Sequence, residues 1–280
     1  VCPTGVRMIL SAAEVAARNK LGIVVGTQRR HDPGYVETIK RIHDGAIGTP
    51  VAGYGYWLNW GLWMKPRQES WTDMEWQLRN WLYFTHLSGD TLVEQALHQV
   101  DIMNWVFGGP PRLAVATGGR QVRTDPAYGN VYDHFAVDYE YPSGARALVV
   151  SRQWDKTYTR VGEYIIGTKG NSMPSNRIRP TGGEEWRHEG KGENPYELEH
   201  RNLIASIRAG SPLNEGKQAA ESTLTAIKGR LAAYTGQAIA WDKMLLSKLD
   251  LTPKEMAFGP CPTPPVAIPG KGDLKAMLGL

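Results

Sequence analysis

The chain has 280 residues, a length that allows one large domain or two modest ones. Hydrophobic residues make up 41% and charged residues 21%, a globular balance that excludes wholesale disorder. The net charge is only +4 and no dense basic cluster occurs, so nucleic-acid binding is not indicated. No apolar run approaches the roughly 18 residues of a membrane span. The two cysteines, Cys2 and Cys261, are too few for a disulfide framework or a Cys-rich zinc site.

The opening of the chain alternates helical and strand patterns, which is α/β in character. The strand pattern at residues 22–28 is short and wholly apolar, a type that is usually buried on both faces of a parallel sheet. We therefore expect a neighbouring strand to pair with its centre, Ile23 to Val25. The predicted elements are a helix over 4–21, a strand over 22–28, a helix over 32–45 and a strand over 49–60.

The pattern changes in the middle of the chain. Apolar residues about four apart predict one long helix over 89–108, ended by Gly108 and Gly109. A period of two then predicts four antiparallel strands, over 112–122, 131–141, 145–154 and 161–168. Two helices over 195–210 and 215–236 and a tail rich in Pro and Gly follow. We therefore predict an α+β fold, with a large, mostly antiparallel sheet and helices on one face.

The predicted central helix carries the residues that most suggest chemistry. Glu94 and His98 are four apart and would share one helical face, with Asp101 three residues beyond. An imidazole beside a carboxylate is a common general base. The same spacing also fits a half-buried helix whose polar residues only make hydrogen bonds and a salt link. A metal site would need His86 or His134 as a third ligand, and neither has a typical spacing, so no metal is predicted.

Tryptophan is concentrated before that helix. Six of the ten tryptophans fall between Trp57 and Trp81, among hydrogen-bonding residues. Indole faces beside polar groups suit a sugar ring, which has apolar C–H faces and a polar rim. The alternative is that these rings fill a core or a subunit interface.

A further candidate lies after the apolar strand at 22–28. Arg30 and His31 follow its carboxyl end, where ligands bind in open α/β sheets, although an ordinary solvated turn fits equally well.

Several segments resemble the Gfo/Idh/MocA sugar dehydrogenases, the relatives of glucose–fructose oxidoreductase and inositol dehydrogenase. The central helix is the most specific, because in this family it carries an acid, a His four residues later and an Asp three after that. The amino-acid sequence is most similar to a bacterial, often exported, carbohydrate-processing branch of the family. The matching segments are VVGTQRRHDPGYVETIKRIHDGAIG, RNWLYFTHLSGDTLVEQALHQVDIMNWVFGG, YIIGTKG and IASIRAGSPLNEGKQAAESTLTAIKGRLAAYTG.

The resemblance implies a two-domain enzyme, in which a Rossmann half binds NAD(P) and an α+β half supplies the substrate site. Residues 1–30 would be the remnant end of the dinucleotide-binding domain, 31–250 the substrate-binding and oligomerisation domain, and 251–280 an extended tail. His98 would be the proton-transferring histidine and Glu94 the preceding acid, which is usually Asp in the family. The resemblance, together with the Trp-rich segment and the central helix, places further residues around the sugar: Arg30, His31, Trp57, Arg79, Trp81, Tyr83 and Asp101.

The cofactor-binding residues are not assigned, because the sequence contains neither G-x-G-x-x-G nor a Walker A motif. The lysine of the family's Glu-Lys-Pro segment would fall just before Val1. Either the sequence begins downstream of a natural N-terminus, or this is a naturally shortened member of the family. In both cases we expect that this chain alone does not bind NAD(P) tightly.

The leading hypothesis is the substrate-binding portion of an NAD(P)-dependent oxidoreductase acting on a sugar-type molecule. His98 would take the proton of a ring hydroxyl as the adjacent hydride moves to nicotinamide. One alternative is a glycosidase of the same family that works by oxidation and elimination, and another is a cofactor-free sugar-binding or assembly protein. We also expect a homo-oligomer formed through the sheet face. An exported, periplasmic location and a cytoplasmic one are left open.

Overall fold

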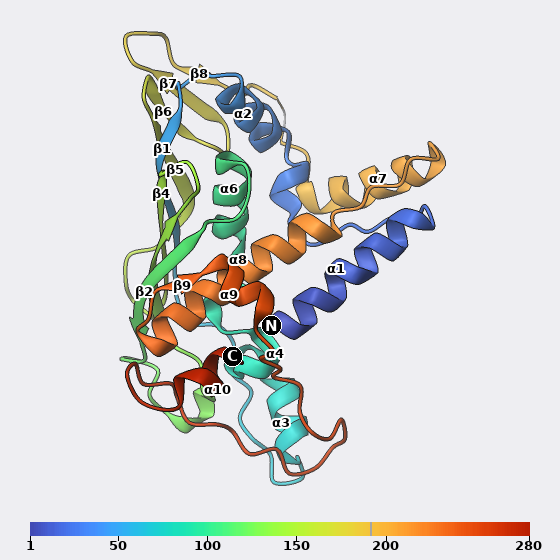
Figure 1. Ribbon diagram of the computed structural model, residues 1–280, viewed down its shortest axis with the longest axis vertical. Helices are drawn as coiled ribbons and strands as arrows, with labels where there is room; N and C mark the ends of the chain where they lie inside the picture. The colour runs from blue at the N-terminus through green and yellow to red at the C-terminus, as the bar shows by residue number, and fades with distance from the viewer. Residues whose placement is uncertain (191) are drawn as a thin grey trace.

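The computed structural model describes residues 1–190 and 192–280. One nine-stranded sheet crosses the molecule in the order β8-β7-β6-β5-β1-β4-β3-β2-β9, and the helices lie on one side of it (Figure 1). The strands are β1 (Pro50–Asn59), β2 (Leu113–Gly119), β3 (His134–Glu140), β4 (Arg146–Gln153), β5 (Arg160–Gly167), β6 (Gly170–Met173), β7 (Arg177–Pro180), β8 (Trp186–Arg187) and β9 (Ile239–Ala240).

The α-helices are α1 (Pro3–Arg18), α2 (Pro33–His43), α3 (Asp73–Arg79), α4 (Thr85–Ser88), α5 (Thr91–Glu94), α6 (Leu97–Phe107), α7 (Pro195–Arg208), α8 (Gly216–Thr235), α9 (Trp241–Leu246) and α10 (Leu274–Leu278). Three short 3₁₀ turns accompany them: η1 (Gln28–His31), η2 (Trp81–Tyr83) and η3 (Pro126–Tyr128). None of the helices in the described part of the chain is both long and apolar enough to cross a membrane.

The pairing of the strands confirms the predicted fold class. β1 runs parallel to β4, and every other named strand pair is antiparallel. Along β3, Phe135, Val137 and Tyr139 are buried while the residues between them are partly exposed. This alternation shows that one face of the sheet carries the core and the other is open, as expected for a sheet covered on one side.

Helix α6 packs unusually close to β1, and two glycines make this possible. A Cβ atom at Gly55 would lie 2.8 Å from the Gln99 Cβ atom, and one at Gly53 would lie 2.6 Å from the Met103 sulfur. Both distances are shorter than real carbon contacts allow, so only glycine lets the helix backbone approach the strand here. This close packing fixes the N-terminal turn of α6 against β1.

The predicted continuous helix over 89–108 is wrong, because the structure divides it into α5 and α6. The helical turn is wider than an α-helical turn at Gln95 and Ala96. There the Ala96 N–H donates to the carbonyl oxygen of Thr91, five residues earlier, at 3.1 Å. The Gln95 side chain is drawn toward the sheet, where its Oε1 accepts hydrogen bonds from Trp57 and Gln153. Spacing within the sequence gave no sign of this tertiary contact.

The predicted strand at 22–28 is also not formed. Only an isolated parallel bridge between Ile23 and Asn214 occurs there, and Ile23, Val24 and Val25 are each partly exposed. The Ile23 N–H donates to the Leu213 carbonyl oxygen at 2.8 Å, so this segment lies along the loop between α7 and α8. An apolar run forms a buried strand only where other strands flank it, and no described residues do so here.

The C-terminal segment lies against distant parts of the chain. The Met74 N–H donates to the Gly259 carbonyl oxygen at 3.1 Å, and the Tyr132 hydroxyl donates to the Ala267 carbonyl oxygen at 2.9 Å. Between α9 and α10 the segment is extended, and it runs past α3 and α4 before it returns to α8 (Figure 1). The tail is therefore part of the packed structure.

Candidate functional site

The side chains of Trp57 and His98 lie next to each other where β1 meets the start of α6. Their ring centroids are 6.1 Å apart and their planes are inclined by 31°. The indole Nε1–H of Trp57 donates to Gln95 Oε1 at 2.5 Å, and Gln153 on β4 donates to the same oxygen. The amide of Gln95 thus holds the indole in place, and its position depends on the break between α5 and α6.

His98 is half-buried, and its ring is predominantly neutral at neutral pH. Burial, with a further contribution from the Arg29 charge, lowers the pKa of His98 to about 4, although Asp101 opposes the shift. Its Nδ1 is buried without a hydrogen-bond partner. A neutral imidazole can accept a proton from a bound hydroxyl, which is the state required of a general base.

Glu94 lies close in sequence but forms no described hydrogen bond or ion pair with His98. Its Oε2 is buried without a partner, and burial raises the pKa of its carboxyl above the ordinary value. The interruption at Gln95 removes the continuous helical face on which the pairing of Glu94 with His98 was predicted. Glu94 therefore has no ion-pair partner among the described residues, and burial outweighs its contact with Gln95 in setting its protonation.

Arg29, which we did not single out in the sequence, is the arginine whose charge acts on His98. It forms a buried ion pair with Glu163 on β5. Glu163 also accepts hydrogen bonds from the Tyr35 hydroxyl at 2.9 Å and from Gln99 at 3.2 Å. These contacts link η1, α2, α6 and β5 in one polar network, and the Arg29 of this network helps to lower the pKa of His98.

Arg30 and His31 make their contacts in a different cluster. Arg30 forms a bidentate ion pair with Asp101. Asp101 also accepts hydrogen bonds from Gln218 at 2.6 Å and from Ser222 at 2.7 Å. His31 is buried, and its Nε2 lies 2.9 Å from Glu215. The polar atoms of Asp101 are occupied by protein groups that join η1 and α6 to α8.

The remaining predicted contact residues lie around α3 and η2. Arg79 pairs with Glu75 at 2.9 Å, and its guanidinium is 4.6 Å from the centroid of the Trp71 ring. Trp81 is exposed, and its ring centroid lies 6.3 Å from that of Trp63.

Tyr83 is fully buried, and its hydroxyl donates to the carbonyl oxygens of Leu62 and Trp63. Of the six clustered indoles, only that of Trp57 is described beside His98.

The N-terminal end of α1 does not fit the pyrophosphate of NAD(P). The dinucleotide folds hold the pyrophosphate on free N–H groups at a helix N-terminus that follows a glycine-rich turn. At the start of α1, Cys2 and Pro3 are buried, and the Thr4 N–H donates to the Leu249 carbonyl oxygen at 3.4 Å. That helix end is occupied by the C-terminal segment. Within residues 1–190 and 192–280, no three His, Cys, Asp or Glu side chains gather as metal ligands.

Comparison with known proteins gives one consistent family. Residues 35–172 match the model of the GFO/IDH/MocA C-terminal domain. The chain is 26% identical over 150 residues to the scyllo-inositol 2-dehydrogenase (NAD(+)) of Bacillus subtilis, a match that covers 52% of this chain and 38% of that protein. It is 26% identical over 107 residues to the 2,7-anhydro-N-acetylneuraminate hydratase of Escherichia coli, covering 38% and 27%.

Among solved structures, the aldose-aldose oxidoreductase of Caulobacter crescentus superposes with a TM-score of 0.65 at 19% identity, over 84% of this chain and 68% of that one. This likeness shows a shared fold. The chain spans well under half the length of the two curated relatives. The activities in their names are therefore properties of those complete proteins.

Proposed function

Because the chain belongs to the GFO/IDH/MocA family, we propose that it is the substrate-binding portion of an NAD(P)-dependent oxidoreductase acting on a sugar or sugar derivative. In this proposal residues 1–30 are the remnant end of a dinucleotide-binding domain, 31–250 form the substrate-binding and oligomerisation domain, and 251–280 form the extended tail. The observation that carries the proposal is the neutral, half-buried imidazole of His98 beside the indole of Trp57.

In the proposed reaction His98 accepts the proton of a bound ring hydroxyl. Burial and the Arg29 charge keep the imidazole unprotonated, so its lone pair is free before substrate binds. Trp57 offers an apolar face to the C–H groups of a sugar ring. Glu94, whose carboxyl is partly buried and lacks a partner on Oε2, is a second proton-exchanging group near the ring hydroxyls. The nicotinamide supplies the redox chemistry in such enzymes, and no step through it is assigned to this chain.

A titration of the purified chain with scyllo-inositol and with glucose tests the substrate site. We expect at least one of them to quench the tryptophan fluorescence saturably, and the Trp57→Phe variant to lose most of that change. Trp186→Phe is the matched control, because Trp186 lies on the distant edge strand β8 under Arg41. Saturable quenching that survives in Trp57→Phe, or no quenching by either compound, would refute the site.

The role of His98 is tested by His98→Asn. The oxidoreductase proposal expects sugar affinity within about threefold of the parent, and a loss of turnover of about 10²–10⁴-fold in the cofactor-competent enzyme. A cofactor-free sugar-binding or assembly protein would instead have no turnover to lose. In the same titrations NAD+ and NADP+ should show no micromolar binding to this chain, and a micromolar Kd would contradict the assignment.

The second candidate is a family enzyme that cleaves or hydrates a sugar linkage by transient oxidation and elimination. It is favoured by one observation, the match of 107 residues to a protein named as an anhydro-sugar hydratase. Analysis of the reaction products distinguishes the two candidates. Net addition of water without consumption of NAD(P) favours elimination chemistry, whereas accumulation of reduced cofactor favours the dehydrogenase.

We also propose that the chain forms a homo-oligomer through the open face of the sheet. In Figure 1 no helix covers that face, where Val115 on β2 is 46% exposed and Leu148 and Val150 on β4 are partly exposed. Apolar side chains gathered on an uncovered sheet face favour association. Sedimentation at micromolar concentration should give a species larger than 31 kDa, and a clean monomer would contradict the proposal.

A further inference from the structure

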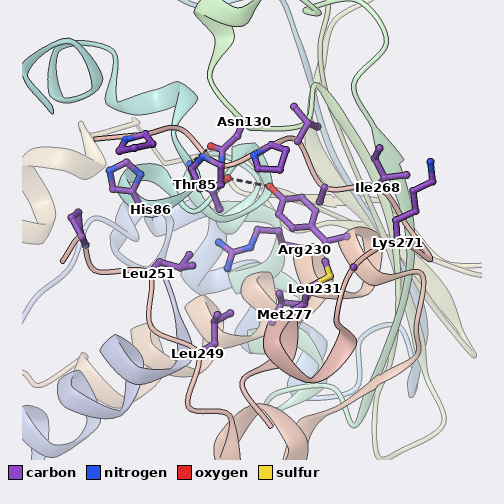
Figure 2. A pocket seen from close by; sticks show the side chains of 18 of the residues that line it. Thr85, His86, Asn130, Arg230, Leu231, Leu249, Leu251, Ile268, Lys271 and Met277 are labelled. Atoms are coloured by element: carbon purple, nitrogen blue, oxygen red, sulfur yellow. Dashed lines mark hydrogen bonds between the residues drawn. The ribbon is translucent and has the colours of Figure 1, made fainter. Parts of the chain in front are cut away.

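A cavity lies away from His98, between the C-terminal segment and the helices α4 and α8. Its volume is about 600 Å³, which lies within the range of small-molecule sites. Figure 2 shows its walls, which are mostly aliphatic and proline side chains of the tail. The apolar lining includes Leu231 of α8 and, from the C-terminal segment, Leu249, Leu251, Pro262, Pro264 and Ile268.

One buried cation faces this apolar space. Arg230 is 1% exposed, and its guanidinium donates to the carbonyl oxygens of Gly89 at 2.8 Å and Val1 at 3.0 Å. Its Nε is buried without a hydrogen-bond partner. In Figure 2 the guanidinium is directed toward the side of the cavity that holds His86 and Leu251, while Lys271 and Ile268 lie on the opposite side.

The charges around the cavity have one sign. Its lining contains the cations Arg230 and Lys271 and no Asp or Glu. Asp90, whose charge acts on Arg230, does not line the cavity and already accepts hydrogen bonds from Tyr234, Tyr132 and Thr91. A buried guanidinium with an unpartnered donor is costly, and an anion that accepts its hydrogen bond would offset this cost.

A second polar group is available on the same side. The Nε2 of His86 is buried and has no hydrogen-bond partner, and burial lowers the pKa of this imidazole, so it is neutral at neutral pH. A neutral imidazole offers one donor and one acceptor, which suits a carboxylate or a carboxylic acid. Thr85 and Asn130 complete this polar end of the lining.

We propose that this cavity binds a small amphipathic carboxylic acid, with its carboxylate on the Arg230 guanidinium and its hydrocarbon body against the leucines and prolines of the tail. The site is separate from the proposed sugar site, since Trp57, Glu94 and His98 do not line it. A polar sugar would leave most of these walls without a matching partner, whereas an alkyl or aryl chain covers them. The bound acid would also hold the C-terminal segment against α4 and α8.

Calorimetric titration of the full chain with decanoate tests the proposal, with 1-decanol as the uncharged analogue. We expect decanoate to bind with a Kd below about 1 mM and decanol to bind at least tenfold more weakly. Arg230→Gln keeps hydrogen-bond donors but removes the charge, and should weaken decanoate binding at least tenfold while leaving decanol binding almost unchanged. Equal affinity for the two compounds, or unchanged decanoate affinity in a folded Arg230→Gln variant, would overturn it.

A second pair of variants keeps the test valid if Arg230→Gln does not fold. Leu251→Glu places a carboxylate in the tail wall of the cavity without removing any contact of Arg230, and should abolish decanoate binding. Leu246→Glu is the matched control, because Leu246 is 74% exposed and does not line the cavity. Equal decanoate affinity in both variants and the parent, or no binding to the parent chain, would refute the site. Neither result bears on sugar binding at Trp57.

Discussion

The guanidinium of Arg30 meets both carboxylate oxygens of Asp101, with 2.8 Å from Nε to Oδ2 and 3.0 Å from Nη2 to Oδ1. Asp101 is 2% exposed, so this pair is shielded from water. Its contacts with Gln218 and Ser222 tie η1 and α6 to α8. The pair is the clearest link between the segment beside the candidate site and the main helix of the core.

Asp101→Asn should therefore destabilise the protein strongly. The substitution leaves the buried charge of Arg30 uncompensated, which typically costs roughly 3–5 kcal/mol. Urea unfolding followed by circular dichroism measures the loss. Asp44→Asn is the control, because the Asp44–Lys40 pair is solvent-exposed and its removal should change little. A similar small effect at both positions would show that the Arg30–Asp101 pair is not a stabilising link.

His98 should make the protein sensitive to mild acid. Its folded pKa is about 4 and its unfolded pKa about 6.5, so between these values the unfolded chain binds more protons than the folded one. Folding stability is thus lost as the pH falls from about 6.5 toward 4, by about 2 kcal/mol from this residue.

The His98→Gln variant should lose less stability than the parent between pH 7 and pH 4.5. Unfolding midpoints at the two pH values measure the difference, and contributions of other groups cancel in the comparison. His200→Gln, at a side chain 75% exposed, should behave like the parent. If His98→Gln and the parent decline equally, the imidazole is not held neutral.

Asp133 should contribute stability at neutral pH that disappears in strong acid. Burial opposes ionisation, but hydrogen bonds from His134 and from the backbone N–H groups of Val122 and Arg123 outweigh it and hold the pKa of Asp133 at about 2. The carboxylate is favoured above about pH 4, and its contribution is lost as the pH falls toward 2.

Asp133→Asn should cost about 2 kcal/mol at pH 7, because the buried acceptor loses its charge and one of its two oxygens is replaced by an NH2 group that cannot accept a hydrogen bond. The difference from the parent should shrink below about pH 3. Thermal melts across this range measure it, with the exposed Glu184→Gln as the control. A difference that does not depend on pH would contradict the assigned ionisation.

Gly55→Ala should destabilise the contact between β1 and α6. The added methyl group would lie 2.8 Å from the Gln99 Cβ atom, so the helix must shift, at a cost of about 1–3 kcal/mol. The same shift should move Gln95 and alter the tryptophan fluorescence of the native state. Gly26→Ala is the control, because no atom lies within 4 Å of its added methyl group. Equal melting temperatures for the two variants would show that the approach is not tight.

Much of the architecture follows from local patterns. β1 to β5 and helices α7 and α8 lie close to the predicted ranges, because a period of two or of about 3.6 residues reports which face of an element is buried. The short strands β6, β7, β8 and β9 were not predicted, since two to four residues hold no measurable period. Their pairing depends on where the neighbouring strand ends.

The candidate site was only partly predictable. The sequence by itself singled out His98 on the central helical region and Trp57 in the strand before it, because residue type and spacing are local properties. Only the tertiary structure decided that Gln95 breaks the helix, that Arg29 rather than Arg30 acts on His98, and that Arg230 faces an apolar cavity. These relationships arise between segments far apart in the chain, where the packing of helices on the sheet determines which polar groups are paired and which remain free.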